Sequence, residues 1–145
     1  MLESNKRRKT KAIIERAMVT LLHKQSFDHI TTVQLAQAAG ISRSSFYTHY
    51  KDKYDMIERY QQNLFHQLGY IFEHNQEDIK TAITEVFQFL QQEPLLAALL
   101  TENGTKEIQN FLRHKLQVML ADNLQDRFSN RIYNHFEKEY SRVFL

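Results

Sequence analysis

Residues 30–53 read ITTVQLAQAAGISRSSFYTHYKDK, and they decide the fold prediction because two short helical segments flank a single glycine. Thr31 followed three positions later by Gln34 is a capping-box pattern, which predicts a helix that begins near Thr31. Gly40 supplies the positive φ that a helix C-terminal cap requires, and Ser42 is suited to cap a second helix. The stretch therefore predicts a helix-turn-helix.

The second of these helices presents mostly short polar side chains, with Phe46 expected to face inward. Serine side chains let a helix backbone approach phosphate closely, and an arginine can donate two hydrogen bonds to guanine or phosphate. A helix of this kind fits the major groove of DNA. An ordinary solvated helix in an all-helical protein is the alternative, and spacing alone does not separate the two interpretations.

The string TTVQLAQAAGISRSSFYTHYKDKYDMI, residues 31–57, resembles the N-terminal DNA-binding domain of the TetR family of transcriptional regulators. The basic start, the amphipathic first helix, the FDHITT entry and the Tyr-x-His-Tyr end of the second helix add to the resemblance. Ser44 and Tyr50 depart from the pattern, which often has glycine or another small residue and Phe at these positions. The resemblance implies a transcriptional repressor that binds a pseudo-palindromic operator as a homodimer and is released by a small apolar effector.

Nine residues are candidates for contact with double-stranded DNA: Thr31, Thr32, Ser42, Arg43, Ser44, Ser45, Tyr47, His49 and Lys53. The expected phosphate ligands are Thr32, Tyr47, His49 and Lys53. The expected base contacts are Arg43 and Ser44 or Ser45. The phosphate role of Lys53 is implied by the resemblance, and a plain surface charge is its alternative.

Composition favours an all-α fold, because the 145 residues are 42% hydrophobic and include only three Gly and one Pro. Cys is absent, which excludes disulfides and thiolate metal sites. No segment resembles a signal peptide, and no apolar run approaches the ~18 residues of a membrane span. A soluble cytoplasmic protein is expected, with no membrane partner.

Charge is distributed unevenly along the chain. Residues 1–60 hold 11 Lys/Arg against 6 Asp/Glu, whereas residues 61–145 hold 8 against 11. A basic surface on the segment with the helix-turn-helix is expected if only that end binds nucleic acid. Chance scatter of surface charge is the alternative.

Three segments are predicted: a three-helix helix-turn-helix domain (1–50), a long connecting helix (51–75) that Asp52 caps, and a helical ligand and dimerisation domain (76–145). Lys6 to Lys11 are expected to form a free basic arm that approaches the phosphate backbone or the minor groove, with a solubilising role as the alternative. In the third segment, Pro94 suits the start of a short buried helix and Thr105 can cap the next. A separate last helix around Phe128 to Val143 stops while its apolar stripe is still running, so this domain is expected to be incomplete.

No catalytic or metal site is expected, and no cofactor. The histidines lack the i, i+3 or i, i+4 spacing of a helical zinc site: they lie at positions 23, 29, 49, 66, 74, 114 and 135. No nucleophile with its base, phosphate-binding glycine loop or paired-carboxylate motif is visible, so an enzyme such as a metal-dependent hydrolase is not expected. The apolar second half fits a plain core or a core with an effector cavity. A helical protein–protein interaction module without specific DNA binding is the main alternative function.

Overall fold

The computed structural model describes the backbone of residues 4–143, with side chains described for residues 4–118 and, beyond them, at positions 120–122, 125, 131 and 135. The regular structure of this range is helical and confirms the predicted all-α class: α1 (Asn5–Leu22), the 3-10 helix η1 (Phe27–His29), α2 (Thr32–Ala39), α3 (Arg43–His49), α4 (Lys53–His74), α5 (Ile79–Gln91), α6 (Pro94–Leu99) and α7 (Lys106–Val143).

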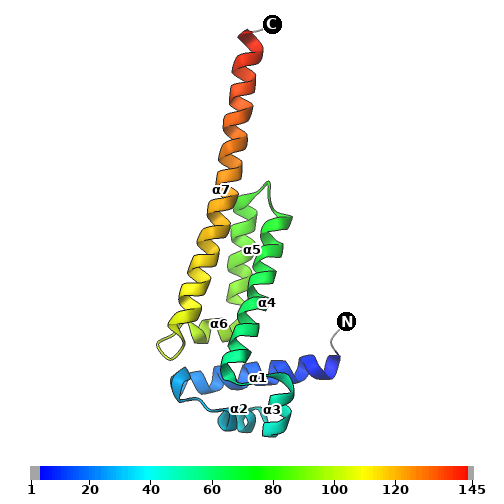
Figure 1. The fold of residues 1–145 in the computed structure, drawn as a ribbon, viewed down its shortest axis with the longest axis vertical. Helices are drawn as coiled ribbons and strands as arrows, with labels where there is room; N and C mark the ends of the chain where they lie inside the picture. Colours follow the sequence, from blue (N-terminus) through cyan, green and yellow to red (C-terminus); the bar gives the residue numbers. More distant parts are fainter. Residues whose placement is uncertain (1–3, 144–145) are drawn as a thin grey trace.

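The helices form two groups (Figure 1). Helices α1, α2 and α3 lie together at one end of the molecule, and these helices with the intervening η1 are called the N-terminal unit here. Helices α4, α5 and α7 extend from it as a bundle, and the short α6 lies across the foot of this bundle, where it packs against α1. Helix α4 runs from the N-terminal unit into the bundle, and α7 continues past the ends of α4 and α5.

The caps of the helix-turn-helix follow the local rules that predicted them. The Thr31 hydroxyl accepts a hydrogen bond from the Gln34 backbone N–H at 3.1 Å, and the Gln34 side chain accepts one from the Thr31 N–H at 3.0 Å. Gly40 ends α2 with φ 70°, and the Ser42 hydroxyl accepts from the Ser45 N–H at 3.0 Å at the start of α3. These contacts confirm the predicted turn.

The basic residues near the N-terminus do not form the expected free arm, because Lys6 to Lys11 lie inside α1. The helix begins at Asn5, where the Ser4 hydroxyl accepts from the Arg7 N–H at 3.2 Å. Lys and Arg are good helix formers, so nothing in this run opposes extension of α1 toward the N-terminus. The expectation was wrong on this point, and the charges of the run are held on a rigid element.

A contiguous apolar core connects the N-terminal unit with the foot of the bundle. Its largest fully buried side chains come from both groups of helices: Phe46, Ile14, Met18, Leu22, Ile30, Leu35, Met56, Leu68, Leu96, Leu99 and Ile108. At roughly 1.5–3 kcal/mol for each large apolar side chain removed from water, this core is the main favourable term that joins the two groups.

Helix α7 is a single helix of 38 residues, whereas the sequence predicted two. It begins after Thr105, whose hydroxyl accepts from the Ile108 N–H at 3.3 Å as predicted. The segment 121–127 contains neither Gly nor Pro, so no residue there breaks the helix. The apolar side chains predicted for the last helix, Phe128 to Val143, lie outside the described side chains.

Two carboxyl groups lie at the contact between α1 and the start of α6. The Tyr60 hydroxyl of α4 donates to Glu93 Oε2 at 2.8 Å. Burial raises the pKa of the Glu15 carboxyl on α1, the nearby Glu93 charge raises it further, and Lys11 opposes the shift. The folded state therefore binds a proton at Glu15 more readily than the unfolded chain does.

We predict that Glu15→Gln stabilises the protein at neutral pH. Because the folded-state pKa of Glu15 is raised, its contribution to stability falls as pH increases from the ordinary carboxyl range through the raised pKa. The glutamine variant removes this loss, so its melting temperature should exceed that of the wild type at pH 7, and the difference should shrink toward pH 4. Melting curves across this pH range, with the exposed Glu73→Gln as control, test the prediction. Equal melting temperatures of Glu15→Gln and wild type at pH 7 would contradict it.

Candidate nucleic-acid interface

Helix α3 presents one polar face to solvent and one apolar face to the core. Phe46 is fully buried, while Arg43, Ser44, Tyr47 and Thr48 are exposed. The Tyr47 side chain is 48% exposed, although its ring edge contacts Phe46 with ring centroids 5.8 Å apart. The outer face therefore offers hydroxyl and guanidinium groups on a helix that is anchored from behind.

Most of the predicted contact residues lie on or beside this face. Ser42, Arg43, Ser44 and Tyr47 are exposed, and Ser45 is half-buried. The hydroxyl oxygens of Ser42 and Ser44 are 3.1 Å apart and hydrogen-bonded.

Two further predicted contact residues, Thr31 and Thr32, lie at the start of α2. Thr31 is exposed and Thr32 is half-buried. The Thr31 hydroxyl already caps α2, so its oxygen also has a local structural role.

His49 corrects one expectation. Its side chain is buried, with 9% exposed, and its ring lies 6.4 Å from that of Tyr50. Positions 46, 49 and 50 share one side of a helix because they are three and four residues apart. The imidazole thus belongs to the inner face of α3 rather than to the face that would meet phosphate.

Lys53 corrects a second expectation, since its side chain is neither a surface charge nor directed outward. Its ammonium group donates to three backbone carbonyls, those of Phe27 at 2.6 Å, Asp28 at 3.2 Å and Ile30 at 2.9 Å. It also lies 4.6 Å from the centroid of the Phe27 ring. Burial lowers the pKa of Lys53, and the Asp28 charge opposes this shift. All three N–H donors of the ammonium are used inside the protein.

Comparison with known proteins supports the assignment of the helix-turn-helix. Residues 13–60 match the family described as bacterial regulatory proteins, tetR family. The N-terminal unit belongs to the TetR family. A regulator from Bacillus subtilis (strain 168), the uncharacterized HTH-type transcriptional regulator YxbF, is 34% identical over 58 residues. That alignment spans 40% of this chain and 15% of the Bacillus protein.

Solved structures share the fold of most of the chain. A TetR-family transcription regulator from Shewanella sp. PV-4 matches with a TM-score of 0.58 and 14% identity, over 83% of this chain and 71% of that one. The fatty acid degradation regulator FadR from Bacillus halodurans matches with a TM-score of 0.59 and 16% identity, over 87% and 70%. At these identities the likeness concerns the fold alone.

Two exposed residues that the sequence did not single out also border the outer face of the TetR-like helix α3. Thr48 is exposed one turn after Ser44, whose carbonyl accepts from the Thr48 hydroxyl at 2.9 Å. Lys51 is exposed just beyond α3, and its backbone N–H donates to Asp55 Oδ2 at 2.9 Å. The four-residue spacing from Ser44 is the signal that would have found Thr48, whereas Lys51 becomes a candidate only once Lys53 is seen to be buried.

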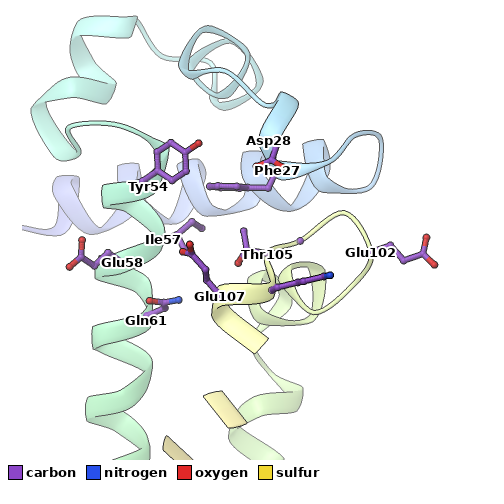
Figure 2. A pocket seen from close by; sticks show the side chains of 11 residues that line it. Phe27, Asp28, Tyr54, Ile57, Glu58, Gln61, Glu102, Thr105 and Glu107 are labelled. Carbon is purple, nitrogen blue, oxygen red and sulfur yellow. The ribbon is translucent and has the colours of Figure 1, made fainter. Parts of the chain in front are cut away.

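A cleft of about 680 Å³ separates η1 and α4 from the loop between α6 and α7. Figure 2 shows Phe27 and Asp28 on one wall, Tyr54 to Gln61 of α4 on another, and Glu102 to Glu107 opposite. The side chains of Glu58 and Glu102 point away from each other at opposite rims. An apolar effector cavity between the helices of the second half was one of the two alternatives from the sequence. This cleft is a different feature, because its lining is rich in carboxylates.

Among the described residues, no group of three or more His, Cys, Asp or Glu side chains is arranged to hold a metal ion. Over the same residues, none of the helices combines the length and apolar character needed to cross a membrane.

We predict that Lys53→Met destabilises the protein rather than selectively removing a phosphate contact. The variant leaves three carbonyls without their cationic donor, which should lower the free energy of unfolding by about 2–4 kcal/mol. Urea denaturation measures this loss. The control is Lys51→Met, whose exposed side chain should change stability by less than about 0.5 kcal/mol. An unchanged urea midpoint for Lys53→Met, with a shallower salt dependence of DNA binding, would restore the phosphate role instead.

Proposed function

We propose that this protein is a DNA-binding transcriptional regulator that inserts α3 into the major groove. The observation that supports the proposal is the exposed polar face of α3 on an N-terminal unit of the TetR family. Repression through a pseudo-palindromic operator, in the cytoplasm, is the activity we infer for it.

In the proposed complex, the contacts divide by chemistry. Arg43 at the start of α3 contacts bases, since its guanidinium can donate two hydrogen bonds to guanine, and Ser44 or Ser45 contacts a neighbouring base. Thr32 and Tyr47 bind phosphate oxygens through their hydroxyls. Lys51 replaces Lys53 as the phosphate-binding cation next to α3, because its side chain is exposed.

The N-terminal half of α1 supplies further positive charge. Lys6, Arg7, Arg8 and Lys9 are exposed in the first two turns of this helix. A rigid basic segment contributes to affinity for the phosphate backbone without contributing to sequence choice.

We propose that the regulator acts as a homodimer, so that two α3 helices reach half-sites about one helical turn apart. The length of α7 beyond α4 and α5 supports this proposal, because it leaves helix surface for a second copy (Figure 1). The sequence of that part has apolar residues at helical spacing, Phe128, Ile132, Phe136 and Tyr140. A small apolar effector that binds among the bundle helices and releases the DNA completes the proposal.

A helical protein–protein interaction module is the second candidate function. The bundle exposes large apolar side chains, among them Phe87 at 63% and Tyr70 at 61%, which are the kind of group that a protein partner covers. DNA binding decides between the two candidates. If mixed duplexes at low salt bind no better than they do to an unrelated protein of equal charge, the interaction module is favoured.

We predict that Arg43→Ala reduces sequence discrimination. Loss of a bidentate base contact should weaken binding to a duplex selected from a random pool by about 1–3 kcal/mol, roughly 5- to 150-fold, with a much smaller effect on mixed duplexes. Fluorescence anisotropy on both kinds of duplex measures the difference. An equal loss on selected and mixed duplexes would assign Arg43 to phosphate.

Lys51→Ala is the complementary variant. A phosphate contact is independent of sequence, so its loss should weaken binding to both duplexes alike and reduce the slope of log K against log salt by about 0.9. The control variant is Lys80→Ala, which should leave the slope unchanged. Lys80 is exposed and belongs to α5, a bundle helix outside the N-terminal unit.

A further inference from the structure

Asn103, in the loop between α6 and α7, contacts the N-terminal unit at two backbone groups. Its side-chain Nδ2 donates to the carbonyl of Leu22 at 2.7 Å, although the two residues are 81 positions apart in the chain. Its own carbonyl accepts from the Phe27 N–H at 2.8 Å. Leu22 ends α1 and Phe27 begins η1. Asn103 therefore bridges the two ends of the segment that connects α1 to η1 and, beyond it, to the helix-turn-helix.

The loop that presents Asn103 is fixed on α6. The Thr101 hydroxyl donates to the Ala98 carbonyl at 2.6 Å, and the Gly104 N–H donates to the Thr101 carbonyl at 3.0 Å. A Cβ atom at Gly104 would lie 1.8 Å from the Leu99 carbonyl oxygen, so only glycine lets the backbone approach α6 this closely. These contacts hold the loop against the C-terminal end of α6.

Phe27 is held from two directions by elements outside the N-terminal unit. Its N–H binds Asn103, and its carbonyl accepts from the ammonium of Lys53 on α4 at 2.6 Å. The neighbours of Asn103 in the chain, Glu102 and Gly104, line the cleft between η1, α4 and the loop. A change in the position of α6 relative to α4 would thus act on η1, which immediately precedes α2.

We propose that Asn103 is a positioning residue that fixes the orientation of the N-terminal unit relative to the bundle and so sets the distance between the two α3 helices of the dimer. The inference rests on the proposed DNA-binding function. In this proposal the side-chain amide of Asn103 couples the loop between α6 and α7 to the N-terminal unit. The expected effect is on half-site spacing and not on the contacts that α3 makes with DNA.

Asn103→Ala in the full chain tests the proposal against a matched variant, Asn75→Ala. Asn75 is also half-buried, and its Nδ2 donates to the Ile71 carbonyl at 2.8 Å and to Glu85 Oε2 at 3.1 Å, both within the bundle. Both variants lose amide hydrogen bonds, but only Asn103→Ala loses one that reaches the N-terminal unit. Similar melting temperatures of the two would show that their general cost is comparable.

The readout is the dissociation constant for two duplexes, one with both half-sites and one with a single half-site. Asn103→Ala should weaken binding to the paired half-sites by roughly fivefold or more and reduce the penalty for inserting a base pair between them, with single-site binding unchanged. Asn75→Ala should change neither. Equal weakening on both duplexes, or no weakening at all, would overturn the proposal.

Amide hydrogen exchange at Phe27 separates this inference from the proposed function. The Phe27 N–H should exchange faster in Asn103→Ala than in Asn75→Ala, because the loop is no longer tied to α1. If the wild type bound no duplex, the proposed function and the spacing role would both fail. The exchange rate at Phe27 would still report whether Asn103 holds the loop against α1 and η1. Unchanged exchange at Phe27 would overturn the positioning role even if DNA binding is intact.

Discussion

The three hydrogen bonds from Lys53 to the carbonyls of Phe27, Asp28 and Ile30 are the constraint on which the placement of the helix-turn-helix depends. A cation in the first turn of a helix is opposed by the helix dipole, and its burial costs several kcal/mol unless its donors are satisfied. Here the carbonyls of η1 and of its C-cap residue Ile30 satisfy them. The consequence is that the start of α4 and the entry to α2 cannot separate without exposing an unpaired charge.

These bonds hold η1 and its following residue against the start of α4. The helical period of α3 then determines which of its side chains face the core and which face solvent. Phe46, His49 and Tyr50 anchor the helix on one side. The opposite side is left to Arg43, Ser44, Tyr47 and Thr48, which are exposed. Short side chains at the centre of this side allow close approach to a groove, while the longer arginine and tyrosine reach outward from it.

Local features of the fold could be predicted from sequence because short-range rules determine them. Neighbouring residues were enough to predict the capping box of Thr31 and Gln34, the left-handed Gly40 and the caps at Ser42, Asp52 and Thr105. The same rules explain one failure. Ser4 is a good cap and precedes residues of high helix propensity, so α1 extends over the run that was assigned to a free arm.

The roles of His49 and Lys53 could not be predicted this way, because they depend on contacts across the fold. Lys53 meets carbonyls more than twenty positions earlier in the chain, and polar residues are expected at the surface unless a partner is known. Family resemblance located the segment and suggested an outward role for Lys53, whereas the outward role of His49 was expected from the chemistry of its imidazole.

Amine-reactive labelling of the free and DNA-bound protein, read by mass spectrometry, tests most directly the placement of Lys53 inside the protein and of Lys51 on the surface that meets DNA. With this placement, Lys51 should be modified in the free protein and protected by a bound duplex, while Lys53 should resist modification in both states. Modification of Lys53 as readily as Lys51 in the folded, DNA-free protein, with protection of Lys53 on adding DNA, would contradict it.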